Sequence, residues 1–240
     1  MKSLLKFPLL VAVATMMSCS FSACSDNDDP TPDTGTSETD AKFEAIAKQY
    51  LDHTVYVTYK NLADETEQLV KDLQALKSSK TDANVKATCE TFLEARAWWE
   101  KSEAFLYGAA TDFGIDPHID SWPLDLDGLQ TALKNTEQVE AMGGEDGDIY
   151  AGEKLGNSLL GFHGIEYILF EDGSPKSVSK ISDLHLTYAV AVAGDLRNRC
   201  WQLELSWRGE SAVNAYRVAK VANELELPYT VNSLSLIHIS

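Results

Sequence analysis

The stretch that decides the fold is "FEAIAKQYLDHTVYVTYKNLADETEQLVKDLQAL", residues 43–76. Its large apolar residues recur at steps of three or four residues or their multiples, which is the spacing of one face of an α-helix. Lysine, glutamate and aspartate fill the opposite face. The pattern therefore predicts one long amphipathic helix over residues 41–77. The expected inward positions are Phe43, Ile46, Tyr50, Val55, Tyr59, Leu62, Leu69, Leu73 and Leu76.

Helical periodicity continues through most of the chain. A second helix is predicted from Ala83 to Gly108, with Thr81 or Asp82 as its N-cap and the glycine as its end. No strand series and no internal repeat is evident. The sequence therefore predicts an all-α protein made of helical bundles with short connections. The further predicted helices cover residues 127–140, 152–170 and 180–206, the third with Leu184, Tyr188, Val192, Leu196, Cys200 and Leu203 inward, and another begins near Ser211.

The N-terminal residues have the pattern of a targeting segment. Residues 1–23 combine a basic start with an apolar stretch, Phe7–Met17, that is too short to span a membrane. A small residue precedes Cys24, as in the processing site of a bacterial lipoprotein. We therefore expect a signal peptide and a lipid anchor on Cys24, with Cys19 as the rival lipidation site. Plain secretion by another cleavage is the alternative.

Residues 24–40 are acidic and lack large apolar side chains, so they predict a disordered tether. Together with the anchor, they indicate a protein of the cell envelope, attached to the outer membrane and either periplasmic or surface-exposed. The formal net charge of −17 argues against nucleic acid as a partner and against charge-driven binding to anionic lipid. It is compatible with cationic partners, including metal ions. Cys89 and Cys200 form one disulfide or stay as buried thiols.

The segment "GFHGIEYILF", residues 161–170, places His163 and Glu166 three residues apart on an otherwise apolar helix. Gly161 and Gly164 each cost such a helix about 1 kcal/mol relative to alanine. This cost is explicable if another backbone approaches closely. The histidine and glutamate are then metal ligands suited to zinc or iron, a catalytic pair, or a buried hydrogen-bonded pair that fixes packing.

Two other segments offer acids and a histidine to the same region. In "WWEKSEAFLYG", helical spacing places Glu103 on a stripe with Trp99 and Tyr107. The segment "DPHIDSWPLD" brings His118 and Asp120 within a loop, residues 112–128, whose large apolar side chains predict that it packs down. A solvent-facing acid and a surface histidine are the structural alternatives. The candidate metal ligands are His163, Glu166, Glu103 and Asp120, with Gly161, Gly164, Trp122 and Pro123 as motif or packing support.

The segments "WWEKSEAFLYG", "IDSWPLD" and "GFHGIEYILF", in this order, resemble the imelysin-like family over residues 41–226. The family hallmark G-x-H-x-x-E corresponds to Gly161, His163 and Glu166. The resemblance implies a secreted or lipid-anchored protein of two helical bundles, linked to iron uptake and classed as a metallopeptidase. Family members continue beyond this chain, so we expect an incomplete second bundle.

The expected organisation follows from these boundaries. After the signal peptide and tether, residues 41–150 form the first bundle with the packed "DSWPLD" loop, and residues 151–228 form the motif helix and the start of the second bundle. In residues 229–240 the helical periodicity stops, and the segment is uncharged and rich in β-formers. We interpret this tail as irregular and artefactual, with a genuine short strand or coil as the alternative.

The function expected from the residues and the resemblance is binding of a divalent or ferric metal ion, iron or zinc, or of a small ligand in iron acquisition. Its partners would be the membrane, through the anchor, and components of iron uptake. Neither an H-E-x-x-H helix nor a G-x-S-x-G elbow is present, which favours a binding protein over an enzyme. The alternatives are a zinc-dependent peptidase of the imelysin type, or a surface lipoprotein that binds protein or glycan with a purely structural motif.

Overall fold

The computed structural model describes residues 38–225. The expected signal peptide, Cys24 and the tail 229–240 lie outside these residues. The tether was predicted to reach residue 40, but Glu38–Asp40 already form the first turn of a helix. None of the helices described in residues 38–225 is long and apolar enough to cross a lipid bilayer. The all-α prediction is confirmed, with one two-stranded hairpin as the exception in this part of the chain.

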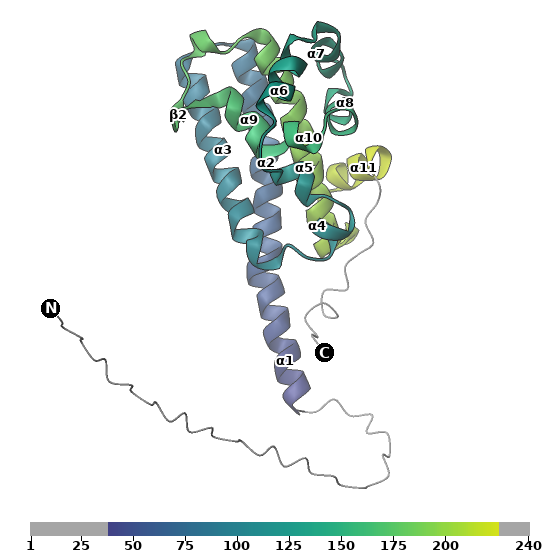
Figure 1. Cartoon of the computed structure of the whole chain (residues 1–240). Coiled ribbons are helices and arrows are strands. Elements are labelled where there is room, and N and C mark those ends of the chain that lie inside the picture. The colour runs from purple at the N-terminus through teal and green to yellow at the C-terminus, as the bar shows by residue number, and fades with distance from the viewer. Residues whose placement is uncertain (1–37, 226–240) are drawn as a thin grey trace, which may run out of the picture. The chain divides into compact units, whose positions relative to one another are not determined.

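The long first helix is confirmed (Figure 1). It consists of α1 (Glu38–Tyr50), a π-helical turn (Leu51–Val55) and α2 (Tyr56–Ser78). Its apolar stripe is buried along α2, where α3 (Asp82–Ser102) and α10 (Asp183–Arg208) cover it. In α1, however, the side chains of Phe43 and Ile46 are 60% and 62% exposed. Their predicted inward placement is wrong, because α1 extends past the helices that flank α2 (Figure 1).

The predicted start of the second helix is confirmed, whereas its predicted end at Gly108 is wrong. The Thr81 side chain accepts a hydrogen bond from the backbone nitrogen of Asn84 at 3.1 Å and caps α3 (Asp82–Ser102). The helix then tightens into a 3₁₀ turn, Glu103–Phe105. Gly108 lies beyond this turn with a φ of +63° and precedes the short helix α4 (Ala109–Asp112).

The last long helix, α10 (Asp183–Arg208), runs through the middle of the fold. Ser182 caps it in a reciprocal arrangement with His185. Helices from both sides of residue 150 pack against it, and residues 38–225 belong to one compact unit. The division into two bundles therefore stays a prediction. Of the predicted inward residues, Tyr188, Val192, Leu196, Cys200 and Leu203 are buried, whereas Leu184 in the first turn is 39% exposed; Cys89 and Cys200 are both buried free thiols.

Two predicted helices are each divided. Asn135 separates α6 (Leu126–Lys134) from α7 (Thr136–Met142), and its side chain accepts a hydrogen bond from the backbone nitrogen of Gln138 at 3.2 Å. The predicted helix 152–170 is broken before the motif, and its last residue enters the hairpin. The elements between α4 and α10 are α5 (Asp116–Asp120), α6 (Leu126–Lys134), α7 (Thr136–Met142), α8 (Gly147–Lys154), the 3₁₀ turn Asn157–Leu159, α9 (Gly161–Leu169), β1 (Phe170–Glu171), β2 (Ser174–Pro175) and the 3₁₀ turn Val178–Lys180.

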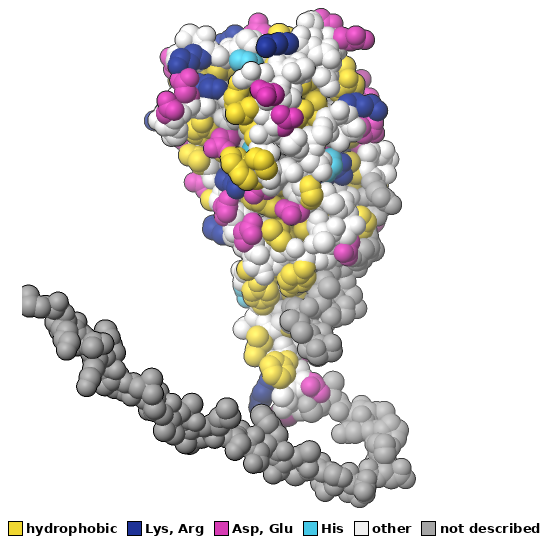
Figure 2. Space-filling model, in the orientation of Figure 1, with side chains coloured by type: hydrophobic (Ala, Val, Ile, Leu, Met, Phe, Trp, Pro, Cys, Tyr) yellow, Lys and Arg dark blue, Asp and Glu magenta, His cyan; other side chains and the backbone are white. Residues whose placement is uncertain are grey.

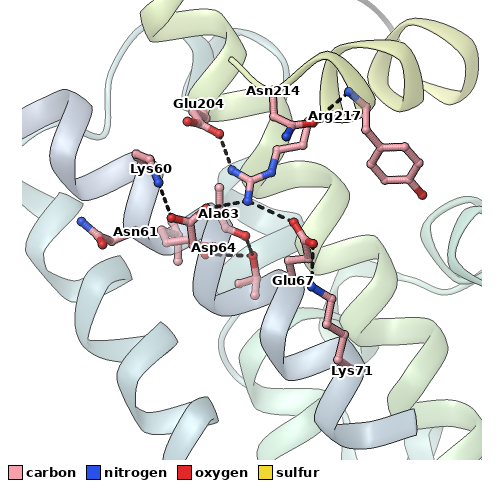
Figure 3. A network of polar contacts seen from close by, with 12 residues as sticks. Lys60, Asn61, Ala63, Asp64, Glu67, Lys71, Glu204, Asn214 and Arg217 are labelled. Atoms are coloured by element: carbon pink, nitrogen blue, oxygen red, sulfur yellow. Dashed lines mark hydrogen bonds and ion pairs between the residues drawn. The ribbon is translucent and has the colours of Figure 1, made fainter. Parts of the chain in front are cut away.

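A cluster of charged side chains holds the last helix, α11 (Ala215–Glu224), against α2 and α10 (Figure 3). Arg217 is 8% exposed. Its guanidinium lies 2.5 Å from Asp64, 3.0 Å from Glu67 and 2.8 Å from Glu204. A 3₁₀ turn, Glu210–Ala212, joins α10 to this helix. We call Arg217 and these three acids the arginine cluster.

Candidate functional site

The motif helix α9 begins at Gly161 because its backbone needs a glycine there. Its φ is +65°, and a Cβ atom would lie 2.1 Å from the carbonyl oxygen of Ile119 in α5. A Cβ on Gly164 would lie 2.7 Å from the carbonyl oxygen of Leu159. Both glycines thus allow the close backbone approach that the sequence suggested. Gly161 starts the helix, however, instead of lying within it.

His163 lies between two carboxylates. Its Nε2 is 3.0 Å from Asp120 Oδ1, and its Nδ1 is 3.1 Å from Glu166 Oε2. The His163 and Asp120 side chains are 16% and 15% exposed, whereas that of Glu166 is 54% exposed. The two acids therefore differ in their access to water. We call His163, Asp120 and Glu166 the histidine cluster.

Helix α3 supplies two donors to Asp120. Arg96 approaches Oδ1 at 2.5 Å, and the indole Nε1 of Trp99 donates to Oδ2 at 2.9 Å. Burial alone would raise the pKa of Asp120, but the hydrogen bonds from Arg96 and Trp99 outweigh burial and hold the pKa below its usual value. Arg96 also pairs with Glu100 at 2.7 Å. Asp120 is thus a fixed, ionised acceptor beside the histidine.

The structure brings three of the four predicted ligands together and separates the fourth. Glu103 is exposed in the 3₁₀ turn that follows α3. Its predicted stripe with Trp99 and Tyr107 assumed a helix that continues to Gly108, and the helix ends at Ser102 instead. That placement of Glu103 is therefore wrong.

The "DSWPLD" loop packs down only in part. Ile115 and Ile119 are fully buried, but the Trp122 side chain is 75% exposed and its ring centroid lies 4.7 Å from that of His163. Pro123 is also exposed. Trp122 therefore contacts His163 at the surface and does not share the burial of Ile115 and Ile119. His118 belongs to a separate contact, with its Nδ1 3.1 Å from Asp195 Oδ2.

Arg96 and Trp99 were not predicted from the sequence as contacts of Asp120. Both come from one face of α3, at positions i and i+3, and converge on an acid 21 to 24 residues later. The available signal was an arginine and a tryptophan, two strong donors, one turn apart on a helix that also carries a predicted site motif. Their common acceptor depends on how α5 packs, which local periodicity does not encode.

An open hollow of about 400 Å³ adjoins the exposed side of the histidine cluster. Hydrophobic side chains and acids are interspersed on the face in Figure 2, and Lys and Arg are scattered on it without forming one basic patch. The lining of the hollow combines apolar side chains with three carboxylates, Glu166, Glu171 and Asp172. The full lining consists of Trp122, Leu124, His163, Glu166, Tyr167, Phe170, Glu171, Asp172 and Gly173.

The donor chemistry suits a metal ion only in part. A neutral imidazole and a carboxylate are ordinary ligands for zinc or iron. Asp120 and Glu166, however, lie at opposite ring nitrogens of His163, so one cation bound at a nitrogen meets only one of them. Among residues 38–225 no group of three or more His, Cys, Asp or Glu side chains is arranged to hold a metal ion. The described chain thus offers a pair of ligands and not a complete site.

Fold and site together define an all-α protein that carries an H-x-x-E pair at the start of a glycine-initiated helix, beside an open hollow. The family model that matches this chain is that of imelysin, over residues 55–234. The protein therefore belongs to the imelysin family, as the resemblance of its three motifs implied.

Known relatives agree with this assignment. The chain is 32% identical over 169 residues to the iron-regulated protein A of Synechococcus elongatus, covering 70% of this chain and 41% of that protein. A solved imelysin peptidase from Bacteroides ovatus matches with 33% identity and a TM-score of 0.50, over 57% of this chain and 39% of the other. The chain thus spans about two fifths of the length of these relatives.

A further solved structure shares the fold. It is a candidate iron-regulated protein A precursor from Parabacteroides distasonis, with a TM-score of 0.63 and 24% identity, covering 85% of this chain and 57% of that chain. At this identity the likeness concerns the fold alone.

Proposed function

We propose that this imelysin-family protein binds a metal cation through His163 and Glu166 and serves iron acquisition at the cell envelope. The iron-related part rests on the family and on the name of the Synechococcus relative, an iron-regulated protein. Lipid anchoring through Cys24 rests on the sequence pattern of the N-terminal residues. The anchor would hold the binding site near a membrane, where components of iron uptake can receive the ion.

The observation that carries the proposal is the pairing of His163 Nδ1 with the half-exposed carboxylate of Glu166 at 3.1 Å. A nitrogen lone pair and a carboxylate that face each other need a proton or a cation between them. A metal ion can replace that proton and take its remaining ligands from water or from a small molecule in the adjoining hollow. The apolar lining of Trp122, Tyr167 and Phe170 suits an organic ligand of the metal.

The test is metal binding to the purified chain, measured by isothermal titration calorimetry with Zn²⁺ and, under anaerobic conditions, with Fe²⁺. We expect one site per chain and at least a tenfold weaker affinity for His163→Ala and for Glu166→Gln. The matched control is His53→Ala, which removes an exposed histidine far along the chain from the motif. Equal affinity of His163→Ala and the unaltered protein would refute the ligand assignment.

The same purified protein tests the alternative function, a zinc-dependent peptidase. Chelator-sensitive cleavage of an unfolded protein substrate, lost in Glu166→Gln, would assign peptidase activity to the pair. Metal binding without cleavage supports the binding function proposed here.

A further inference from the structure

We propose that the hollow beside the histidine cluster binds a guanidinium group, carried either by an arginine side chain or by a small guanidine compound. Trp122 provides the aromatic face on which the planar cation stacks. The carboxylates at the rim of the hollow, above all that of Asp172, accept hydrogen bonds from its N–H groups. The inference goes beyond the proposed function, because it needs no metal ion.

The first observation is that Trp122 differs from the other four tryptophans of the chain. Its side chain is 75% exposed, and only one part of its ring contacts His163. The ring of Trp98 is covered by Lys101, whose Nζ lies 3.5 Å from the ring centroid. The remaining three are at most 1% exposed, namely Trp99, Trp201 and Trp207.

Elsewhere the chain covers aromatic rings with its own cations. The guanidinium carbon of Arg197 lies 4.6 Å from the centroid of the Trp201 ring, and Lys176 Nζ lies 4.8 Å from that of Tyr167. Such a contact stabilises by about 0.5–1 kcal/mol at an exposed site, and tryptophan is the strongest aromatic partner. Of the lysines and arginines in residues 38–225, none lies over the ring of Trp122. Its open face is therefore available to a cation from outside the chain.

The second observation is the charge of the lining. The residues that line the hollow include three acids and neither lysine nor arginine. Glu171 is paired with Lys180, and Glu166 is paired with His163. Asp172 is exposed, and it forms no ion pair within the described residues 38–225. The lining therefore disfavours an anion and offers a free carboxylate to a cation.

The hairpin after α9 places this carboxylate at the rim. Strands β1 and β2 pair antiparallel, with Glu171 opposite Ser174, so that Asp172 and Gly173 form the turn. Their φ values are +52° and +73°, as in the two-residue turns that favour Asp-Gly. The turn fixes the backbone of Asp172 while its side chain stays exposed to a ligand.

The chemistry of the lining distinguishes a guanidinium from other cations. An indole face has no lone pair for a metal ion. A quaternary ammonium group binds in a cage of several aromatic rings, whereas this hollow offers one open indole face, because Tyr167 already has Lys176 over its ring. A guanidinium is planar and weakly hydrated, stacks on a single aromatic face and donates to carboxylates. The hollow, at about 400 Å³ and open on one side, can admit such a group.

The experiment is an NMR titration of the full chain in a buffer with a chelator, so that metal binding plays no part. The probes are acetyl-arginine amide and acetyl-citrulline amide, which have nearly the same shape but differ in charge. The indole N–H signal of Trp122 is identified by its loss in Trp122→Leu. We expect the arginine probe to shift this signal to saturation and the citrulline probe to bind at least about fivefold more weakly. Equal affinity for the two probes, or no saturable shift with arginine, would overturn the inference.

Two variants with matched controls identify the residues. Trp122→Leu keeps an apolar side chain without the aromatic face, and Asp172→Asn removes the charge but tolerates the positive φ. Each should weaken binding of the arginine probe at least about twofold, as followed at the Gly173 amide signal. Tyr216→Leu, at a 66% exposed aromatic of α11, and Asp146→Asn, at an exposed acid before α8, should leave the affinity unchanged. A control that weakens binding as much as its matched variant would overturn the assignment.

Further probes separate the two sources of the guanidinium. Tighter binding of acetyl-Gly-Arg-Gly amide than of methylguanidine supports an arginine of a partner protein, and the reverse supports a small guanidine compound. Equally tight binding of the corresponding lysine peptide would overturn the assignment to a guanidinium. Because these titrations exclude metal ions, their failure leaves the proposed metal binding in place. Failure of the Zn²⁺ titration likewise leaves this inference in place.

Discussion

The histidine cluster and the arginine cluster are both built from one nitrogen side chain surrounded by carboxylates, yet they differ in what they can exchange. Arg217 keeps its charge at any physiological pH and has donors only, so its three acids satisfy it permanently. His163 has two nitrogens, of which one can offer a lone pair, and its second acid, Glu166, is half exposed. The arginine cluster therefore joins helices. In the histidine cluster, by contrast, a ligand can replace the proton that lies between the imidazole and a carboxylate.

The difference also lies in where the charges meet. The arginine cluster connects α11 to α2 and α10, and its Glu204 is 2% exposed (Figure 3). The histidine cluster opens on a hollow of about 400 Å³. The buried arginine cluster therefore connects helices. The histidine cluster is open to solvent on one side, so a ligand can reach it. The number of acids around a cationic side chain therefore does not by itself distinguish a structural ion pair from a binding site.

The largest effect is expected from Gly161→Ala, which disturbs the contact between α5 and α9 that holds the histidine cluster together. A Cβ would meet the Ile119 carbonyl oxygen at 2.1 Å, in a backbone region that disfavours alanine. We expect a loss of about 4 kcal/mol in the free energy of unfolding, measured by urea denaturation. The matched control is Gly173→Ala, which has a φ of +73° but no neighbouring atom within 4 Å. It should lose only about 1 kcal/mol; equal losses would mean that the α5 contact contributes nothing.

Next in size is Arg217→Met, which removes the centre of the arginine cluster. We expect a loss of about 2 kcal/mol, below the value for a fully buried pair because Asp64 and Glu67 are partly exposed. Metal affinity, measured by calorimetry on the folded variant, should not change. Lys71→Met, which removes an exposed partner of Glu67, should alter stability by less than about 1 kcal/mol. A weaker metal affinity in Arg217→Met would contradict the purely structural role of the arginine cluster.

A smaller effect is expected from Asp120→Ala on metal binding. Loss of a carboxylate next to a histidine ligand lowers metal affinity by about tenfold to a hundredfold, and we expect the lower end because Trp122 still contacts the imidazole. Calorimetry with Zn²⁺ measures it. Asp125→Ala, which removes an acid of the same loop that caps α6, is the control and should leave the affinity within twofold. No change in Asp120→Ala would separate Asp120 from the site.

The smallest effect is on the pH dependence of stability. Burial raises the pKa values of Asp64 and Glu67, but hydrogen bonds from Lys60, Lys71 and Arg217 outweigh burial and hold both below their usual values. A lowered pKa in the folded state adds stability that is present above the unfolded value, near pH 4, and is lost as the pH falls through the folded value. The loss of stability from pH 5 to pH 3 should therefore be shallower in Arg217→Met, as measured by urea denaturation; an unchanged slope would contradict it.

Much of the fold follows from local patterns. The long helix over residues 38–78 and the Thr81 cap depend on periodicity and on one side chain near its own backbone, and both could be predicted. The break before α9 could not, because the positive φ of Gly161 is set by the approach of α5. The sequence indicated that Gly161 is unfavourable within a helix, but not that it is the first residue of one.

The site divides in the same way. His163 and Glu166 are neighbours by helical spacing, and their pairing was predictable. The convergence of Arg96 and Trp99 on Asp120 joins residues 21 to 24 positions apart, and depends on packing between α3 and α5. Glu103 was misplaced because a single change from α-helix to 3₁₀ turn rotates every later residue. The apolar character of Trp122 indicated packing, but not that its ring contacts His163 at an exposed position.

The origin of the histidine cluster in two separate segments, α5 and α9, has a thermodynamic consequence. Asp120 and His163 are neighbours only in the folded chain. A cation that needs both the imidazole and its neighbouring acid therefore binds the folded form almost exclusively. Such a ligand raises the unfolding free energy by RT ln(1 + [L]/Kd), which is about 2.7 kcal/mol at a hundredfold excess over Kd. If the proposed metal binding holds, the melting temperature of this protein should rise with the free metal concentration.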